Sequence, residues 1–275
     1  MKKISFLLLL LTCYCQVIAA VPKRIVTLSA ALTETADALG FANSIIAVDV
    51  TSIYPAYINK LPKVSNNRSV SAEALIAFSP DLVLAPEGSV SKEIQYQLKS
   101  AGIRFVSIKQ EYSVKGALNF IRQVAAALQV AQKGEVIARQ TELKINQALS
   151  GVKAKGKLPK VLFIYARGTG TMMVAGKKSS LAAIINLAGG VNAVNEFEDF
   201  KPYTTEALVK ANPDVILLFN FGYSSLGGIN SILKMPGVAQ TSAGKHKKIV
   251  QMEPSLLVNF SVRLDQAITE LNGKI

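Results

Sequence analysis

Two stretches of this sequence, SAEALIAFSPDLVL at residues 71–84 and TTEALVKANPDVIL at residues 204–217, repeat one pattern at an offset of 133 positions. Each copy opens with a hydroxyl residue, a preferred helix cap because its oxygen accepts a bond from a free backbone amide. Glu73 and Glu206 then fall in the first helical turn, where the helix dipole favours a carboxylate. In both copies Pro-Asp ends the helix before an apolar run. The repeat therefore predicts one helix–strand unit built twice.

Short apolar runs alternate with helical stretches on both sides of each copy. Such alternation is typical of parallel sheets covered on both faces, so we predict the α/β fold class, with two Rossmann-like lobes. We assign residues 21–130 to an N-terminal lobe and residues 158–275 to a C-terminal lobe. The expected strands are Ile25–Leu28, Ile45–Val48, Leu82–Ala85, Phe105–Ile108, Val161–Tyr165, Val215–Phe219 and Ile249–Met252.

A long helical region lies between the predicted lobes. Apolar residues recur at helical spacing over residues 118–128 and again over residues 145–152. We expect a connecting helix over residues 131–157, which ends in a lysine-rich stretch followed by a proline. A helix that joins two lobes restricts their opening more than flexible strands would. We therefore expect the ligand in a cleft between the lobes, where the loops after parallel strands converge.

Residues 1–20 have the pattern of a secretory signal peptide. Lys2 and Lys3 precede an apolar run, Ile4–Leu11, that is too short to span a bilayer, and small residues follow up to Ala20. We predict cleavage after Ala20 and a periplasmic location. An N-terminal membrane anchor and a lipid-modified cysteine are the alternatives to an ordinary cleaved signal.

The composition narrows the classes of function. The chain has 275 residues, with 31 Lys and Arg against 18 Asp and Glu, one His and two Cys. Cys13 and Cys15 both lie in the predicted signal, which disfavours a zinc scaffold or a haem–thiolate enzyme. Loss of Lys2 and Lys3 lowers the formal charge from +13 to +11. A basic exported protein suits an anionic ligand or membrane surface better than nucleic acid, although charge that only solubilises the chain explains it equally well.

An exported α/β chain with two lobes and a helical connector resembles the substrate-binding proteins of ABC importers for metal chelates. The segment AVDVTSIYP at residues 47–55 is similar to the pattern Val-Asp-x-Thr-Ser-x-Tyr-Pro of the haem-binding members. The resemblance covers essentially the whole mature chain and implies capture of ferric haem for an importer. Further similar segments, in the order of the family pattern, are Leu61–Val64, Arg68, Ser71–Leu75, Met173–Gly176, Leu187–Ala193, Lys201–Pro202 and Leu233–Gly244.

The resemblance implies that Tyr54 is the axial ligand of the haem iron. Ferric iron is a hard centre, a phenolate is a hard anionic donor, and Tyr is an established haem ligand. Bound iron favours loss of the phenol proton. Without its flanking motif, Tyr54 would be taken for an ordinary half-buried surface residue. Arg68 and Arg167 are predicted to pair with the haem propionates, because a planar guanidinium bonds both carboxylate oxygens, although most surface arginines are simply solvated.

The sequence departs from the haem-binding pattern in two places. Some haem-binding relatives carry a His after the first strand of the second lobe, but residues 165–170 contain none. Many relatives have an Arg where Phe221 stands. We therefore expect five-coordinate haem on Tyr54. The unproven candidates for the opposite haem face are Met172, Met173, Tyr203 and Tyr223.

Glu73 and Glu206 also have a functional interpretation. In the family that the chain resembles, one glutamate on each lobe pairs with arginines of the membrane permease, and the repeat supplies one glutamate per lobe. Surface ion pairs of this kind orient docking more than they strengthen it. Stabilisation of the helix start explains the two residues as well. The expected partners are haem and an inner-membrane ABC permease, without nucleic acid, and we expect a monomer.

Other functions have less support from the residues. His246 lies among lysines, as solvated turn residues often do, and receives no role. No nucleophile paired with a base is visible, so we do not expect an enzyme. Gly168-Thr169-Gly170 lacks the third glycine of a dinucleotide-binding fingerprint. An Fe(III)-siderophore or cobalamin is the alternative ligand. Tyr54 separates haem from a siderophore, because siderophore iron arrives with its coordination sites filled.

Overall fold

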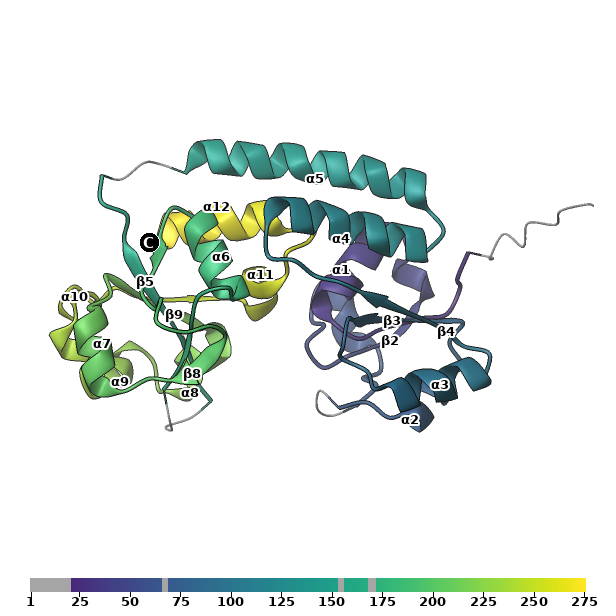
Figure 1. The fold of residues 1–275 in the computed structure, drawn as a ribbon, viewed down its shortest axis with the longest axis horizontal. Helices are drawn as coiled ribbons and strands as arrows, with labels where there is room; N and C mark the ends of the chain where they lie inside the picture. The colour runs from purple at the N-terminus through teal and green to yellow at the C-terminus, as the bar shows by residue number, and fades with distance from the viewer. Residues whose placement is uncertain (1–20, 66–68, 153–155, 168–171) are drawn as a thin grey trace, which may run out of the picture.

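The computed structural model describes residues 21–65, 69–152, 156–167 and 172–275. Two lobes lie side by side beneath one long helix, and the chain ends in the second lobe (Figure 1). The predicted signal over residues 1–20 lies outside the described residues. Within the described part, no helix is both long and apolar enough to cross a membrane.

The N-terminal lobe contains a four-stranded parallel sheet. Its strands are β1 (Ile25–Thr27), β2 (Ile45–Val48), β3 (Leu82–Pro86) and β4 (Arg104–Ile108). They lie in the order β2-β1-β3-β4, and each agrees with a predicted run to within one residue at either end. The helices of this lobe are α1 (Ala30–Ala38), η1 (Ala42–Ser44), η2 (Ala56–Lys60), α2 (Ala72–Ile76), α3 (Lys92–Ser100) and α4 (Val114–Ala127).

The C-terminal lobe contains a six-stranded sheet. Its strands are β5 (Lys160–Tyr165), β6 (Met173–Ala175), β7 (Val191–Asn192), β8 (Phe200–Pro202), β9 (Val215–Phe219) and β10 (Ile249–Met252). The path is β10-β9-β5-β6-β8, with β7 also paired to β5. Its helices are α6 (Ser180–Leu187), α7 (Thr205–Ala211), α8 (Asn220–Ser225), α9 (Ile229–Leu233), η3 (Val238–Gln240), α10 (Ser242–Lys245), α11 (Pro254–Val258) and α12 (Leu264–Lys274).

The sheet of the C-terminal lobe is mixed, where the sequence predicted only parallel strands. The α/β class and the three predicted strands β5, β9 and β10 are confirmed, and these three pair in parallel. Strands β6 and β8 run antiparallel to their neighbours. Each is three residues long, and β8 is exposed along its whole length, so neither leaves an apolar pattern in the sequence.

Both faces of the central strands of each sheet are buried, as expected for strands that read as continuous apolar runs. In β3, Leu82 and Leu84 pack toward α1 and α4, whereas Val83 packs on the opposite face toward α2 and α3. In β9, Leu217 and Ile216 alternate in the same way between two separate cores. Helices on both faces leave the carboxyl edge of each sheet free for a site.

The repeated stretch forms the same unit in each lobe. Ser71 and Thr204 cap α2 and α7, and each accepts a bond of 3.1 Å from the backbone amide three residues later. The aspartates of the two Pro-Asp pairs also correspond. Asp81 accepts a backbone bond of 2.7 Å from just before β1, and Asp214 accepts one of 2.9 Å from the start of β5. The repeat thus ties each helix–strand unit to the first strand of its lobe.

Helix α5 (Ala131–Gly151) joins the lobes and packs on α4 of the first lobe and α12 of the second (Figure 1). It begins at the predicted residue and ends before the predicted limit at 157; residues 153–155 lie outside the described part. Gly134 allows the close approach to α4, because a Cβ at this position would lie 2.2 Å from the Cβ of Ala125. The connector is therefore a rigid element packed on both lobes.

An exposed ion-pair cluster adds to the contact between α4 and α5. Glu135 of α5 accepts a bond of 2.7 Å from Arg122 of α4 and one of 3.0 Å from Arg139. These hydrogen bonds hold the pKa of Glu135 down at about 2. Because the cluster is open to solvent, it contributes less than the apolar packing beneath it.

Candidate functional site

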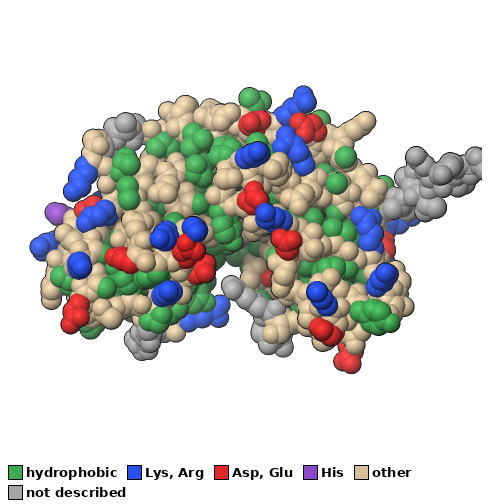
Figure 2. Space-filling model, viewed as in Figure 1, with side chains coloured by type: hydrophobic (Ala, Val, Ile, Leu, Met, Phe, Trp, Pro, Cys, Tyr) green, Lys and Arg blue, Asp and Glu red, His purple; other side chains and the backbone are tan. Residues whose placement is uncertain are grey.

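A cleft of about 950 Å³ opens between the two lobes. Figure 2 shows this hollow on the side of the molecule away from α5. The parallel strands β1 to β5, β9 and β10 each contribute to the cleft a residue at or just beyond their carboxyl ends; the short β7 does not. This arrangement confirms the predicted position of the cleft. In chain order these residues are Leu28, Asp49, Pro86, Gln110, Tyr165, Phe219 and Pro254.

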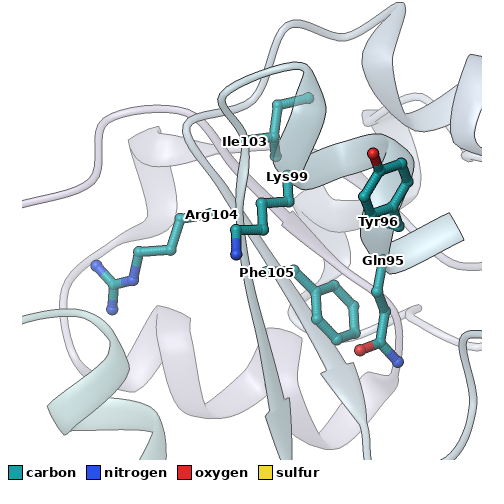
Figure 3. A pocket seen from close by; sticks show the side chains of 6 residues that line it. All are labelled: Gln95, Tyr96, Lys99, Ile103, Arg104 and Phe105. Carbon is teal, nitrogen blue, oxygen red and sulfur yellow. The ribbon is translucent and has the colours of Figure 1, made fainter. Parts of the chain in front are cut away.

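A second cavity, of about 390 Å³, lies beside α3 and β4 (Figure 3). Tyr96 at its edge is 72% exposed, and Phe105 lines its inner part. Arg104 also lines it and donates a hydrogen bond to the backbone oxygen of Ala127. None of the predicted site residues lies there, and it is separate from the strand ends that form the interlobe cleft.

A chain of buried hydroxyl groups holds the loop that follows β2. Asp49 accepts bonds from the amide of Thr51 at 3.0 Å and from the hydroxyl of Ser52 at 2.6 Å. Ser52 in turn bonds to Thr33 of α1 at 2.7 Å, and Thr33 bonds to Thr27 of β1 at 2.6 Å. The Asp-x-Thr-Ser part of the motif therefore has a structural role: it fixes the loop that carries Tyr54.

Tyr54 stands at the edge of the cleft. The neighbouring Ile53 lines the cavity, whereas Tyr54 is 40% exposed and is not among the lining residues. The face of its ring is covered from the other lobe by the guanidinium of Arg263, whose Cζ lies 3.8 Å from the ring centre. The structure thus places Tyr54 at a contact between the lobes, with its iron-binding role still a prediction.

The C-terminal lobe presents an aromatic wall to the cleft. Tyr165, Phe219 and Phe221 all line it and meet edge to face or tilted, with ring centres 5.4–6.1 Å apart. Arg167 lies over Phe221 at 5.1 Å, and its Nε donates a bond of 2.8 Å to the hydroxyl of Tyr165. Among the described residues that line the cleft, Arg167 is the only cation and Asp49 the only anion.

The sequence interpretation missed Tyr165. Its place as the last residue of β5 could have identified it, because the end of a parallel strand points at the cleft. It was read instead as part of a buried run. Its phenol, which accepts a bond from Arg167, lies on the wall opposite the loop that carries Tyr54.

The four candidates for the opposite haem face are not among the residues that line the cleft. Met172, Tyr203 and Tyr223 pack against the core beneath α7 and α9. Tyr223 accepts a bond of 3.2 Å from the amide of Ile229, and burial raises the pKa of Tyr203. Met173 belongs to β6, which pairs with the end of β5. Sequence position suggested that these side chains lie near the site, but three of them pack against the core of the C-terminal lobe instead.

The remaining predicted residues fall into two groups. Arg68 lies outside the described residues. Glu73 and Glu206 are exposed in the first turns of α2 and α7, one on each lobe. Figure 1 shows both helices on the side of the molecule away from α5, the side on which the cleft opens. The structure thus places one free carboxylate on each lobe, and their contact with a permease stays a prediction.

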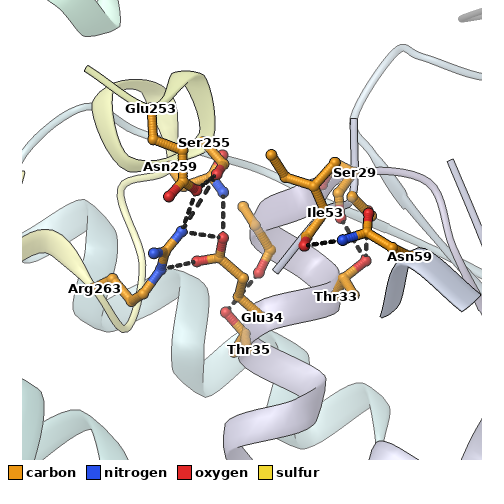
Figure 4. A network of polar contacts seen from close by, with 12 residues as sticks. Ser29, Thr33, Glu34, Thr35, Ile53, Asn59, Glu253, Ser255, Asn259 and Arg263 are labelled. Atoms are coloured by element: carbon orange, nitrogen blue, oxygen red, sulfur yellow. Dashed lines mark hydrogen bonds and ion pairs between the residues drawn. The ribbon is translucent and has the colours of Figure 1, made fainter. Parts of the chain in front are cut away.

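A buried ion-pair network joins the lobes beside the cleft (Figure 4). Arg263, before α12, bonds to Glu34 of α1 through Nε at 3.0 Å and through a terminal nitrogen at 2.8 Å. The same nitrogen bonds to Glu253 at 2.9 Å. Asn259 donates a bond of 3.3 Å to Glu34.

Burial and pairing oppose each other in this network. Burial raises the pKa of Glu34, and the hydrogen bonds and charge of Arg263 act against that rise. Burial also acts to lower the pKa of Arg263, but the bonds to Glu34 and Glu253 outweigh it and raise that pKa. The guanidinium is therefore charged and fixed in place.

The lining of the cleft suits a large, flat, mostly apolar ligand that carries an anionic group. Aromatic side chains form one wall, hydroxyl groups and the start of α1 form the other, and Arg167 offers a single guanidinium. Apolar walls with a few placed polar groups are the usual composition of small-molecule sites. No group of three or more His, Cys, Asp or Glu side chains that could hold a metal ion is found among the described residues.

Several known proteins are similar to this chain. The periplasmic heme-binding protein RhuT from Roseiflexus sp. RS-1, in its apo form, is 34% identical, has a TM-score of 0.87, and is matched over 92% of this chain and 97% of its own. The uncharacterized ABC transporter substrate-binding lipoprotein YvrC of Bacillus subtilis (strain 168) is 28% identical over 92% of this chain and 80% of its own length. A vitamin B12-binding protein of Vibrio parahaemolyticus is 29% identical over 74% of each.

The family model described as periplasmic binding protein matches residues 25–256, which include the connector, most of both lobes and all the residues that line the cleft except Val258 and Asn259. Together with the two-lobed α/β fold and the interlobe cleft, this match shows that the chain belongs to the periplasmic binding protein family.

Proposed function

We propose that this protein binds ferric haem in the interlobe cleft and delivers it to an ABC importer in the inner membrane. The observation that carries the proposal is the aromatic wall with a guanidinium-bonded phenol, facing the loop that presents Tyr54. Haem has a large apolar ring, which suits the aromatic wall, and two carboxylates, which suit the guanidinium. Its iron accepts a phenolate, which the phenols can supply. The likeness to a heme-binding protein at a TM-score of 0.87 supports the same ligand.

Tyr54 is the proposed iron ligand from the N-terminal lobe. Its ring is exposed at the mouth of the cleft, and the loop beneath it is held by the bonds of Asp49 and Ser52. A phenol on a fixed loop loses little conformational freedom when it binds iron, which favours affinity. Ferric iron then favours the deprotonated oxygen, as metals do for bound acids.

Tyr165 is the proposed donor on the opposite face. Its hydroxyl oxygen already accepts a bond from a cation, the Nε of Arg167 at 2.8 Å, which fixes the direction of this oxygen on the wall of the cleft. This assignment replaces the five-coordinate haem on Tyr54 that the sequence predicted, and with it the methionines and tyrosines named as unproven candidates for the opposite face. The remaining nitrogens of Arg167, with Arg68 from the N-terminal lobe, are proposed to pair with the haem propionates.

The protein is proposed to work in the periplasm, exported by the signal over residues 1–20 and acting as a monomer. Glu73 and Glu206 are proposed to contact arginines of the permease, one from each lobe. Both carboxylates stand free in the first turn of a short helix on the side where the cleft opens. No enzymatic step is part of this proposal.

Cobalamin is the second candidate ligand. A relative named as a vitamin B12-binding protein matches 74% of this chain, at 29% identity, so the fold alone does not decide between the two. Cobalamin has no carboxylate tails and does not need phenolate donors. The Arg167–Tyr165 pair in the cleft favours haem over cobalamin.

A competition titration tests the ligand. The purified protein without residues 1–20 is titrated with hemin, with cobalamin and with a ferric siderophore, and binding is followed by visible absorption. Saturable binding of hemin with a ferric phenolate spectrum, together with weak or no binding of the other two, is the expected result. Tighter binding of cobalamin than of hemin would refute the proposal.

A further inference from the structure

The contact between Arg263 and Tyr54 crosses from one lobe to the other. Arg263 precedes α12 of the C-terminal lobe, and its Cζ lies 3.8 Å from the ring centre of Tyr54, on the loop after β2 of the N-terminal lobe. At this distance a guanidinium is attracted to the face of an aromatic ring. Neither residue lines the cavity itself, although their neighbours Ile53 and Asn259 do.

Arg263 is held much more firmly than Tyr54. It is 7% exposed and makes two bonds to Glu34, one to Glu253 and one of 3.3 Å to Ser255. Tyr54 is 40% exposed, and an exposed tyrosine on a loop ordinarily samples several rotamers. The fixed guanidinium of Arg263 therefore determines the orientation of the Tyr54 ring, and the ring does not determine the position of Arg263.

We propose that Arg263 positions Tyr54 for ligand binding, and that its bonds to Glu34 make this positioning depend on contact between the lobes. The inference rests on the function proposed above, in which Tyr54 binds iron. Glu34 belongs to α1 of the N-terminal lobe and is 2% exposed. When the lobes separate, Arg263 leaves Glu34 and the ring of Tyr54 together, because both are on the opposite lobe. A change in lobe arrangement, such as docking on a permease, would thus release the ring.

The first test observes Tyr54 without haem. The protein is labelled with 3-fluorotyrosine, and the ¹⁹F resonance of Tyr54 is assigned as the one missing in Tyr54→Phe. Arg263→Lys keeps the charge and removes the planar fork, and Glu34→Gln weakens the bond across the lobes without touching Tyr54. Both substitutions are expected to shift and broaden the Tyr54 resonance and to leave that of the distant, exposed Tyr96 unchanged. An unchanged Tyr54 resonance in Arg263→Lys would overturn the proposal.

The second test measures hemin affinity and the spectrum of the complex. Arg263→Lys is expected to weaken hemin binding by about five- to tenfold and to alter the ferric phenolate band, because a single ammonium cannot both bond Glu34 through two nitrogens and lie over the ring of Tyr54, so the cation–π contact is weakened. Arg122→Lys is the matched control, since Arg122 also bonds a glutamate but lies on α4 away from the cleft. A shifted resonance with unchanged hemin affinity and spectrum would show contact without positioning, and would also overturn the proposal.

The two tests separate this inference from the proposed function. Wild-type protein that binds no hemin refutes haem as the ligand, whereas the ¹⁹F resonance reports the tie between Arg263 and Tyr54 independently of any ligand. Circular dichroism checks that each variant folds. Should Glu34→Gln fail to fold, Glu253→Gln removes one partner of Arg263 at a side chain that is 30% exposed, and it is expected to broaden the same resonance.

Discussion

Two phenols lie at the same cleft on opposite lobes, Tyr54 at its edge and Tyr165 on its wall, and each contacts an arginine in a different way. Arg263 covers the ring of Tyr54 at 3.8 Å, so it acts on the direction of the side chain. Arg167 donates to the oxygen of Tyr165 at 2.8 Å, so it acts on the donor atom itself.

Replacement of Tyr165 by Phe tests the second phenol. The substitution keeps the ring packed on Phe219 and removes the oxygen that Arg167 bonds. We expect hemin to bind still through Tyr54, about tenfold more weakly because a charge-assisted bond is lost, with a spectrum changed to a five-coordinate form. Absorption and electron paramagnetic resonance of the complex measure this. A spectrum identical to that of the wild-type complex would remove Tyr165 from the site.

At the scale of single residues, the motif made Tyr54 the predicted iron ligand, a role that stays a prediction, whereas no pattern pointed to Tyr165. The motif is visible because Asp49 and Ser52 are required to hold the loop, and these bonds leave a fixed spacing in the sequence. The role of Arg263 left no such trace. Arg263 is held in place by Glu34, which lies 229 positions away in the sequence, and only the assembled fold brings these two residues together. Contacts across the lobes are the part of the site that one sequence does not reveal.

At the scale of elements, α5 determines how the lobes are held. It packs along α4 through Gly134, where a Cβ would meet that of Ala125 at 2.2 Å, and it reaches α12 of the other lobe. The apolar spacing over residues 145–152 predicted a helix there, and the C-terminal part of α5 covers most of that range. The predicted strands were also found, because buried parallel strands are continuous apolar runs. The exceptions, β6 and β8, are too short to show a period.

Replacement of Gly134 by Val tests the packing of the connector. The added side chain would push α5 away from α4, and overpacking of this kind costs about 1–3 kcal/mol, more than the gain from replacing a helical glycine. The free energy of unfolding in urea measures the loss. Gly151→Ala is the matched control on the same helix, since a Cβ there meets nothing within 4 Å, and it is expected to cause no loss. Equal stability of Gly134→Val and wild-type protein would contradict this packing.

At the scale of the whole molecule, the repeat explains why the two lobes offer matching surfaces. Each lobe places one copy of the capped helix on the side where the cleft opens, with its glutamate exposed in the first turn. A partner that contacts both carboxylates therefore senses the distance between the lobes. The same distance governs the contact between Glu34 and Arg263, so the proposed docking and the proposed positioning of Tyr54 would both depend on one arrangement of the lobes.

Reversal of both docking charges tests the outer surface. The double variant Glu73→Lys and Glu206→Lys is expected to reduce haem uptake by proteoliposomes that contain the cognate importer about tenfold, because charges on the rim of an interface control encounter. Hemin affinity of the free protein should not change. Glu142→Lys, an exposed change on α5, serves as the control. Normal uptake by the double variant would remove these glutamates from the docking surface.

The central claim is that Tyr54 binds the iron of haem at this cleft, and a visible absorption titration of Tyr54→Phe with hemin, run beside wild-type protein, tests it most directly. Phe keeps the ring against Arg263 and removes only the oxygen. We predict that wild-type protein shows saturable, one-step formation of a ferric phenolate spectrum and that Tyr54→Phe loses this spectrum, with at least a tenfold weaker affinity. A Tyr54→Phe variant that keeps both the wild-type spectrum and the wild-type affinity would contradict the account.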